Sequence, residues 1–124
     1  APMPTPTIDD LFAVAVDAAY LAGQRTLAHF QAGVAAEYKE DDTPVTVADR
    51  EAERVLRERI LASFPDHAIL GEEEGESAGT APYRWVVDPI DGTKAFVSGV
   101  PLYGTLVAVE HEGRVVAGAI HIPA

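Results

Sequence analysis

The sequence predicts an α+β fold in which two long helices and an antiparallel sheet form separate layers. Helical periodicity dominates the first half of the chain, whereas two strand-like segments separated by a two-residue turn close the second half. This order differs from the regular strand–helix alternation of parallel α/β proteins. The length of 124 residues fits one domain, and 48% hydrophobic with 23% charged residues is typical of a globular protein.

The first predicted helix follows Thr7, whose side chain can cap it, and runs to about Phe30. Asp9 and Asp10 in its first turn match the positive end of the helix dipole. Gly33 suits the position after the helix. Apolar residues recur at helical spacing, and the alanines among them predict close packing: Ile8, Leu11, Phe12, Ala15, Ala19 and Ala22.

The second predicted helix begins at Thr46, after a short strand at 34–39 and a polar loop at 39–44. Asp49 stands three residues after Thr46, which is the spacing of a capping box. Pro65 marks the end of this helix. Its buried stripe is expected to comprise Ala48, Ala52, Val55, Leu56 and Ile60.

The second half predicts the strands of the sheet. Short strands are expected at 68–70 and 83–88, joined by an acidic, glycine-containing loop at 72–82, and a short helix should cover 92–98. Two further strands, 102–111 and 114–122, flank a Glu-Gly pair that suits a two-residue hairpin turn. The final strand reaches almost to the last residue, so we expect residues 1–124 to be the amino-terminal portion of a single larger domain.

The charge of the chain excludes several classes of function. Nine Lys and Arg against twenty Asp and Glu give a formal charge of -11, which argues against binding to nucleic acid or to an anionic membrane. The two lysines, Lys39 and Lys94, are expected at the surface, and an anionic substrate would need bound metal to reverse the local charge. The absence of cysteine removes disulfides and thiolate chemistry. With neither a signal-peptide core nor a membrane-spanning run, the sequence predicts a cytoplasmic protein.

Acidic side chains follow two predicted strands and begin one predicted helix. Glu72 and Glu73 follow the strand at 68–70, and Asp88 ends the strand at 83–88. If these strands are neighbours, Glu72 and Asp88 emerge at the same edge of the sheet. Because Asp followed by Pro favours a tight reversal, we also expect Asp91 within about 7 Å of Asp88 at Cα. Carboxylate oxygens are the ligands that Mg²⁺ prefers.

Three motifs occur in order along the chain: Thr46-Val47-Ala48-Asp49, Gly71-Glu72-Glu73 and Asp88-Pro89-Ile90-Asp91-Gly92-Thr93. Together they resemble the inositol monophosphatase family of Mg²⁺-dependent, lithium-sensitive phosphomonoesterases. The stretch 91–109 is most similar to the histidinol-phosphate phosphatase branch. The resemblance implies the layered sandwich of inositol monophosphatase and fructose-1,6-bisphosphatase, a small phosphorylated metabolite as substrate, and a homodimer.

The resemblance also implies the metal ligands. Glu72, Asp88 and the backbone carbonyl of Ile90 would bind one Mg²⁺, and Asp88 and Asp91 would bind a second, with two or three ions in the complete site. Asp88 would bridge two ions. Li⁺ would inhibit the enzyme.

The remaining roles concern water and phosphate. Asp49 and Thr93, with Glu72 beside them, match the residues that activate a metal-coordinated water for direct attack on phosphorus. Asp91, Gly92 and Thr93 would bind the phosphate group. Glu73 matches the second acidic residue of its motif.

Family members are considerably longer, and the sequence departs from their pattern at one ligand. Their later half supplies a further Asp in a Trp-Asp motif, whereas Trp85 here is followed by Val86. Three interpretations therefore stay open: a histidinol-phosphatase of histidine biosynthesis, an inositol monophosphatase, or a catalytically incomplete fragment that binds metal or a partner.

Competing motifs fail on spacing. A haloacid dehalogenase phosphatase needs a second aspartate two residues after Asp88, where Ile90 stands, and an EF-hand counted from Asp88 needs Glu where Gly99 stands. A turn with a helix cap is the plainer interpretation of the motif around Asp88 when it is taken alone. The histidines show no metal-ligand spacing and are expected at ordinary surface or core positions: His29, His67, His111 and His121.

Overall fold

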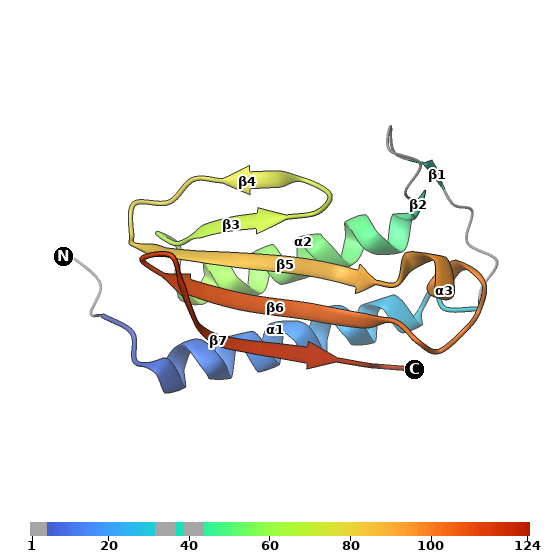
Figure 1. The fold of residues 1–124 in the computed structure, drawn as a ribbon, viewed down its shortest axis with the longest axis horizontal. Coiled ribbons are helices and arrows are strands. Elements are labelled where there is room, and N and C mark those ends of the chain that lie inside the picture. Colours follow the sequence, from blue (N-terminus) through green and yellow to red (C-terminus); the bar gives the residue numbers. More distant parts are fainter. Residues whose placement is uncertain (1–4, 32–36, 39–43) are drawn as a thin grey trace.

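The computed structural model describes residues 5–31, 37–38 and 44–124. Two long helices, α1 (Ile8–Leu27) and α2 (Val47–Ser63), pack against each other and cover one face of a five-stranded sheet, as Figure 1 shows. The predicted layered α+β arrangement is confirmed. None of the helices in the described ranges is long and apolar enough to cross a bilayer.

The sheet has the strand order β4-β3-β5-β6-β7. Its strands are β3 (Ala68–Gly71), β4 (Gly75–Ser77), β5 (Tyr83–Asp91), β6 (Gly104–His111) and β7 (Arg114–His121). The pair β3 and β5 is parallel and the other pairs are antiparallel, so the sheet is mixed rather than wholly antiparallel. The short helix α3 (Thr93–Val97) lies where β5 ends, near the two-stranded ladder of β1 (Glu37–Tyr38) and β2 (Pro44–Val45) (Figure 1).

Two strand predictions needed correction. The loop expected at 72–82 contains the edge strand β4, whose three residues are polar or glycine and pair through their backbone. The strand expected to end at Asp88 continues to Asp91. The hairpin prediction is confirmed, because Glu112 and Gly113 have φ angles of 52° and 82°, as a primed two-residue turn requires.

Both long helices begin where their caps predict. Thr7 and Thr46 each form a capping box with the acidic residue three positions later. Helix α1 ends at Leu27, earlier than expected, and Gly33 lies outside the described residues. Ala15, Ala19 and Ala22 of α1 are buried as expected, but the expectation that Ile8 and Phe12 join them is wrong, since they are 61% and 50% exposed.

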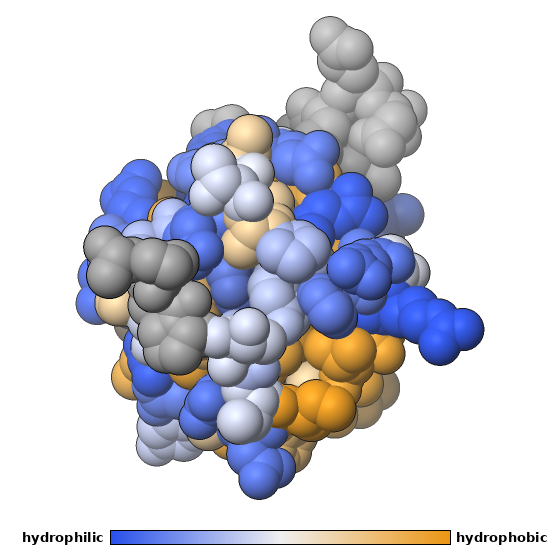
Figure 2. Space-filling model, turned by 90° about the vertical axis from the view of Figure 1, so that its left-hand side faces the viewer, coloured by the Kyte–Doolittle hydropathy of each residue, from blue (hydrophilic) through white to orange (hydrophobic). Residues whose placement is uncertain are grey.

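The core lies between the helices and one face of the sheet. Trp85, Val87, Val107 and Val109 alternate along β5 and β6 toward the helices and are at most 2% exposed. The intervening residues point to the other face, which no helix in the described part of the chain covers (Figure 1). Large hydrophobic side chains remain exposed on α1 and β7, and Figure 2 shows an apolar area beside an otherwise hydrophilic end of the molecule.

Candidate metal and phosphate site

The parallel register of β3 and β5 brings two predicted site residues together. Gly71 is paired with Val87, so Glu72 and Asp88 follow at the same edge of the sheet. Glu72 is exposed at the turn between β3 and β4, whereas Asp88 is half-buried within β5. Both line a groove of about 700 Å³ on the face of the sheet opposite the helices. These two carboxylates therefore border one open cavity.

A β-bulge, not a tight turn, places Asp91 with Asp88. Asp88 is paired with Leu106 and Asp91 with Gly104, so three steps along β5 match two steps along β6. A regular strand would send residues three apart to opposite faces, but the extra residue of a bulge returns Asp91 to the face of Asp88. The expected reversal at Pro89 is wrong, because this residue is part of β5.

Negative charge is concentrated around Asp88. Burial, together with repulsion from the neighbouring carboxylates, raises the pKa of Asp88 from its ordinary 3.8 to about 7. These carboxylates belong to Glu72, Asp91, Asp49 and Glu73. Raised pKa values of this kind are found where carboxylates share one site without a compensating cation.

Asp49 is buried and uses both of its oxygens. Oδ2 accepts hydrogen bonds from the backbone N–H of Thr46 at 2.9 Å and from its hydroxyl at 2.7 Å. Oδ1 lies 3.2 Å from the hydroxyl of Thr93. Asp49 therefore caps α2 with one oxygen and contacts Thr93 with the other.

The hydroxyl of Thr93 lies between two acceptors. Besides Asp49, it is 3.1 Å from the backbone carbonyl of Ile90. The side chain of Ile90 is buried in a small second core that fixes this end of β5, formed with Ala48, Phe96 and Tyr103. Gly92 has a φ angle of 92°, a left-handed conformation that glycine adopts without strain, and it directs the chain from β5 into α3.

The donor set fits a hard divalent cation, because it consists of carboxylates and a backbone carbonyl. The charge crowded around Asp88 supports the same conclusion, since a cation there would relieve the repulsion. Within the described residues, however, no three His, Asp or Glu side chains converge closely enough to enclose an ion. The structure thus gathers the predicted ligands at one edge of the sheet without forming a closed cage. Lys94 is exposed on α3, and Lys39 lies outside the described residues.

Two polar residues near this edge were not predicted from the sequence. Glu53 is fully buried on α2 and accepts hydrogen bonds from the turn that carries Glu72. Thr105 is buried on β6 and donates its hydroxyl to the carbonyl of Pro89 at 2.9 Å, which ties the bulge to the next strand. A signal for Glu53 was present, because it falls on the apolar stripe of its helix.

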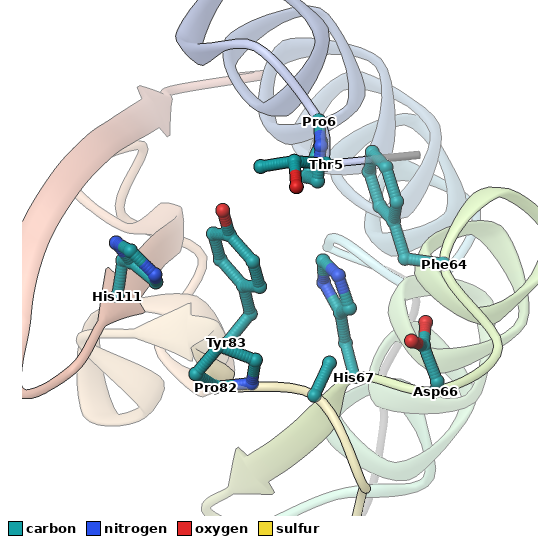
Figure 3. Close-up of a pocket in the computed structure, with 9 residues that line it drawn as sticks. Thr5, Pro6, Phe64, Asp66, His67, Pro82, Tyr83 and His111 are labelled. Carbon is teal, nitrogen blue, oxygen red and sulfur yellow. The ribbon is translucent and has the colours of Figure 1, made fainter. Parts of the chain in front are cut away.

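A second cavity, of about 250 Å³, lies at the other end of β5. Figure 3 shows the rings of Phe64, His67, Tyr83 and His111 side by side along it. His67 accepts a hydrogen bond at Nδ1 from the indole N–H of Trp85 at 2.9 Å. Burial lowers the pKa of His67, and the charge of Asp66 partly opposes this effect. His67 is thus a neutral, buried histidine, which agrees with the ordinary core position expected for it.

Comparisons with known proteins find related sequences. The matching family model is described as the inositol monophosphatase family and covers residues 7–124. A histidinol-phosphatase of Chlorobaculum parvum is 46% identical over 112 residues, which are 90% of this chain and 43% of the relative. An inositol-1-monophosphatase of Rhizobium meliloti is 43% identical over 81 residues, which are 64% of this chain and 30% of the relative.

Solved structures show the same fold. The extragenic suppressor protein suhB of Bartonella henselae has a TM-score of 0.86 at 32% identity, over 91% of this chain and 45% of that chain. An IMPase of Thermotoga maritima has a TM-score of 0.84 at 31% identity, over 92% of this chain and 44% of that chain. The chain therefore spans less than half the length of these relatives.

Proposed function

Because this chain belongs to the inositol monophosphatase family, we propose that it supplies the metal- and phosphate-binding edge of a Mg²⁺-dependent phosphomonoesterase. The observation that carries the proposal is the crowding of carboxylates around Asp88 at the rim of an open groove, where burial and this crowding together raise its pKa to about 7. A site of this charge attracts divalent cations, which in turn attract phosphate.

The ligand assignment follows the sequence motifs. Glu72, Asp88 and the carbonyl of Ile90 would hold one Mg²⁺, and Asp88 and Asp91 would hold another. Bound Mg²⁺ would supply positive charge to the phosphate oxygens and make water more acidic. The backbone of Gly92 and Thr93, directly after these ligands, would contact the phosphate group.

The chain's own residues would orient and deprotonate the attacking water. Thr93 Oγ1 can accept a proton from this water while passing its own proton to Asp49 Oδ1, which lies 3.2 Å away. The water oxygen then attacks phosphorus, the ester P–O bond breaks, the leaving alkoxide takes a proton from solvent water, and Asp49 releases its proton to solvent. Asp49 suits this role because its other oxygen is fixed by Thr46.

For the substrate we propose histidinol phosphate. This choice is supported by the matched length, since the histidinol-phosphatase of Chlorobaculum parvum aligns with 90% of the chain. Inositol monophosphate is the second candidate, because the inositol-1-monophosphatase of Rhizobium meliloti is 43% identical to this chain, although over only 64% of it. The predicted homodimer and the cytoplasmic location stay predictions.

We further propose that residues 1–124 form the amino-terminal portion of one phosphatase domain. The support is the chain's coverage of its relatives, which is 43% for the histidinol-phosphatase of Chlorobaculum parvum. On this view the chain binds metal but turns over substrate slowly or not at all unless complementary residues are present.

One assay tests these proposals together. Phosphate release is measured with Mg²⁺, with and without Li⁺, on this chain and on a version extended to the length of its relatives. The panel contains histidinol phosphate, inositol monophosphate and a 3'-phosphorylated nucleotide. We expect Li⁺-sensitive hydrolysis of histidinol phosphate in the longer version, and absence of Mg²⁺-dependent release there would contradict the phosphatase proposal.

A further inference from the structure

Glu53 is fully buried, and its carboxylate accepts hydrogen bonds from the turn between β3 and β4. Its Oε1 accepts the backbone N–H of Glu73 at 2.9 Å, and its Oε2 accepts the backbone N–H of Glu74 at 2.8 Å. A buried carboxylate is tolerated only when its oxygens are hydrogen-bonded. Both oxygens are thus committed to the backbone immediately after Glu72.

Arg57, one helical turn after Glu53, contacts the same turn, and we call Glu53 and Arg57 together the clamp. Its Nε lies 3.3 Å from Oε2 of Glu53, and its guanidinium also donates to the hydroxyl of Ser77 and to the carbonyl of Gly75. The two side chains of α2 therefore hold the turn and the start and end of β4. This arrangement connects α2, which also carries Asp49, to the loop that carries Glu72.

The residue before Glu72 is fitted to the same carboxylate. A Cβ atom added to Gly71 would lie 2.4 Å from Oε1 of Glu53. The backbone of Gly71 does not have a left-handed φ angle, so glycine is needed here for space and not for conformation. The carboxylate cannot easily move aside, because that would break its bonds to Glu73 and Glu74.

We propose that Glu53 is a positioning residue that fixes the backbone on both sides of Glu72 and thereby sets where its carboxylate meets a metal ion. Gly71 packs on Glu53 before Glu72, and the N–H of Glu73 bonds to it afterwards. Glu72 itself is exposed at a turn, where backbone freedom would otherwise be costly to metal binding. The inference rests on the proposed function, because it assigns Glu72 to the metal site.

The first test measures the clamp without metal. Amide hydrogen exchange of Glu73 and Glu74 is followed by NMR in the wild-type chain and in Glu53→Gln. Glutamine puts an NH₂ donor where one of two acceptors was, so one backbone N–H loses its partner. We expect slow exchange of both amides in the wild type and at least about tenfold faster exchange of one in the variant. Fast exchange in the wild type, or no change in the variant, would overturn the clamp.

The second test measures Mg²⁺ affinity by calorimetry. Glu53→Gln is expected to weaken binding by about 10–100-fold, which is the range for residues that orient metal ligands. In a Glu72→Gln background the same change is expected to cost nothing further, because Glu53 acts through Glu72. An equal loss in both backgrounds would contradict the positioning role. Glu58→Gln, on the exposed side of α2, is the matched control and should behave as wild type.

Gly71→Ala tests the positioning role of Glu53 without changing Glu53 itself. The added methyl group would displace the carboxylate, so exchange at Glu73 and Mg²⁺ affinity should change in the same direction as in Glu53→Gln. Wild-type exchange and affinity in this variant would contradict the inference. If the wild type bound no Mg²⁺, the proposed function would fail, while the exchange measurements would still decide whether the clamp exists.

Discussion

The hydroxyl of Thr93 lies 3.2 Å from Oδ1 of Asp49, a residue 44 positions earlier in the chain. This contact joins the start of α3 to the capped start of α2. Asp49 is immobilised through its other oxygen by Thr46, so Thr93 faces a fixed acceptor. The orientation of the hydroxyl that would deprotonate the attacking water is thereby linked to a helix cap.

Thr93→Ala is expected to slow chemistry more than it weakens metal binding. The change removes the hydroxyl that would orient the attacking water, while the proposed carboxylate ligands remain. In a version of the protein that turns over, we expect kcat to fall by about 10²-fold, with a much smaller change in Mg²⁺ affinity. Thr93→Ser retains the hydroxyl and serves as the control. An unchanged kcat in Thr93→Ala would remove this residue from the mechanism.

Asp88→Asn is expected to change stability and function in opposite directions. It removes the proposed bridging charge, so Mg²⁺-dependent turnover should fall by at least about 10²-fold. The raised pKa of Asp88 means that its charged form is disfavoured in the fold, and this penalty grows as pH rises from about 3.8 and is complete above about 7. At pH 8 without metal, the variant should therefore be at least as stable as wild type.

Thermal unfolding at pH 8, with and without Mg²⁺, measures the expected stability of Asp88→Asn. Wild type should gain stability on addition of Mg²⁺ and Asp88→Asn should gain little. Asp9→Asn removes an exposed charge from the first turn of α1 and should preserve the response to Mg²⁺. A full Mg²⁺ response in Asp88→Asn would count against the two-metal assignment.

Local features of the fold could be predicted from the sequence. Thr7 and Thr46 cap their helices through residues three positions away, and the turn at Glu112 depends only on its own pair of residues. The neighbouring positions of Glu72 and Asp88 were predicted on the condition that their strands are neighbours, and the parallel register of β3 and β5 confirms that condition.

Features that depend on distant partners could not be predicted. The bulge that aligns Asp88 with Asp91 arises from pairing with β6, and a local Asp-Pro pattern suggested a turn instead. Glu53 lies on the apolar stripe of its helix, but the contact it makes could not be predicted, because its partner is a backbone N–H 20 residues away. The exposed Ile8 and Phe12 of α1 show the same limit, since periodicity does not say how wide the buried face is.

Thr105→Val is expected to loosen the bulge. Valine has nearly the shape of threonine but cannot donate to the carbonyl of Pro89, which Thr105 does at 2.9 Å in a buried position. Leaving a buried carbonyl unpaired costs about 1–3 kcal/mol of unfolding free energy. Urea denaturation should show this loss for Thr105→Val but not for Thr105→Ser, and Mg²⁺ affinity should fall in the first variant only. Equal stability of the two variants would argue that the bulge does not need this bond.

Acid destabilisation is expected to depend on His67. Its Nδ1 must be unprotonated to accept the hydrogen bond from Trp85, and burial keeps its pKa below the ordinary 6.5. The unfolded chain therefore binds a proton at a higher pH than the fold does. The contribution of His67 to stability is complete above pH 6.5 and is lost as pH falls through the lowered pKa.

His67→Asn tests this origin of the pH dependence. The side-chain oxygen of asparagine can accept from Trp85 in place of Nδ1 but does not titrate, while the lost ring stacking with Phe64 and Tyr83 lowers stability at every pH. Between pH 7 and pH 5 the free energy of unfolding of wild type should fall by up to about 1.4 kcal/mol per pH unit more than that of the variant. Urea denaturation at several pH values measures both slopes. His29→Asn, at a partly exposed histidine that contacts Glu51, is the control, and parallel slopes for wild type and His67→Asn would show that another group carries the acid sensitivity.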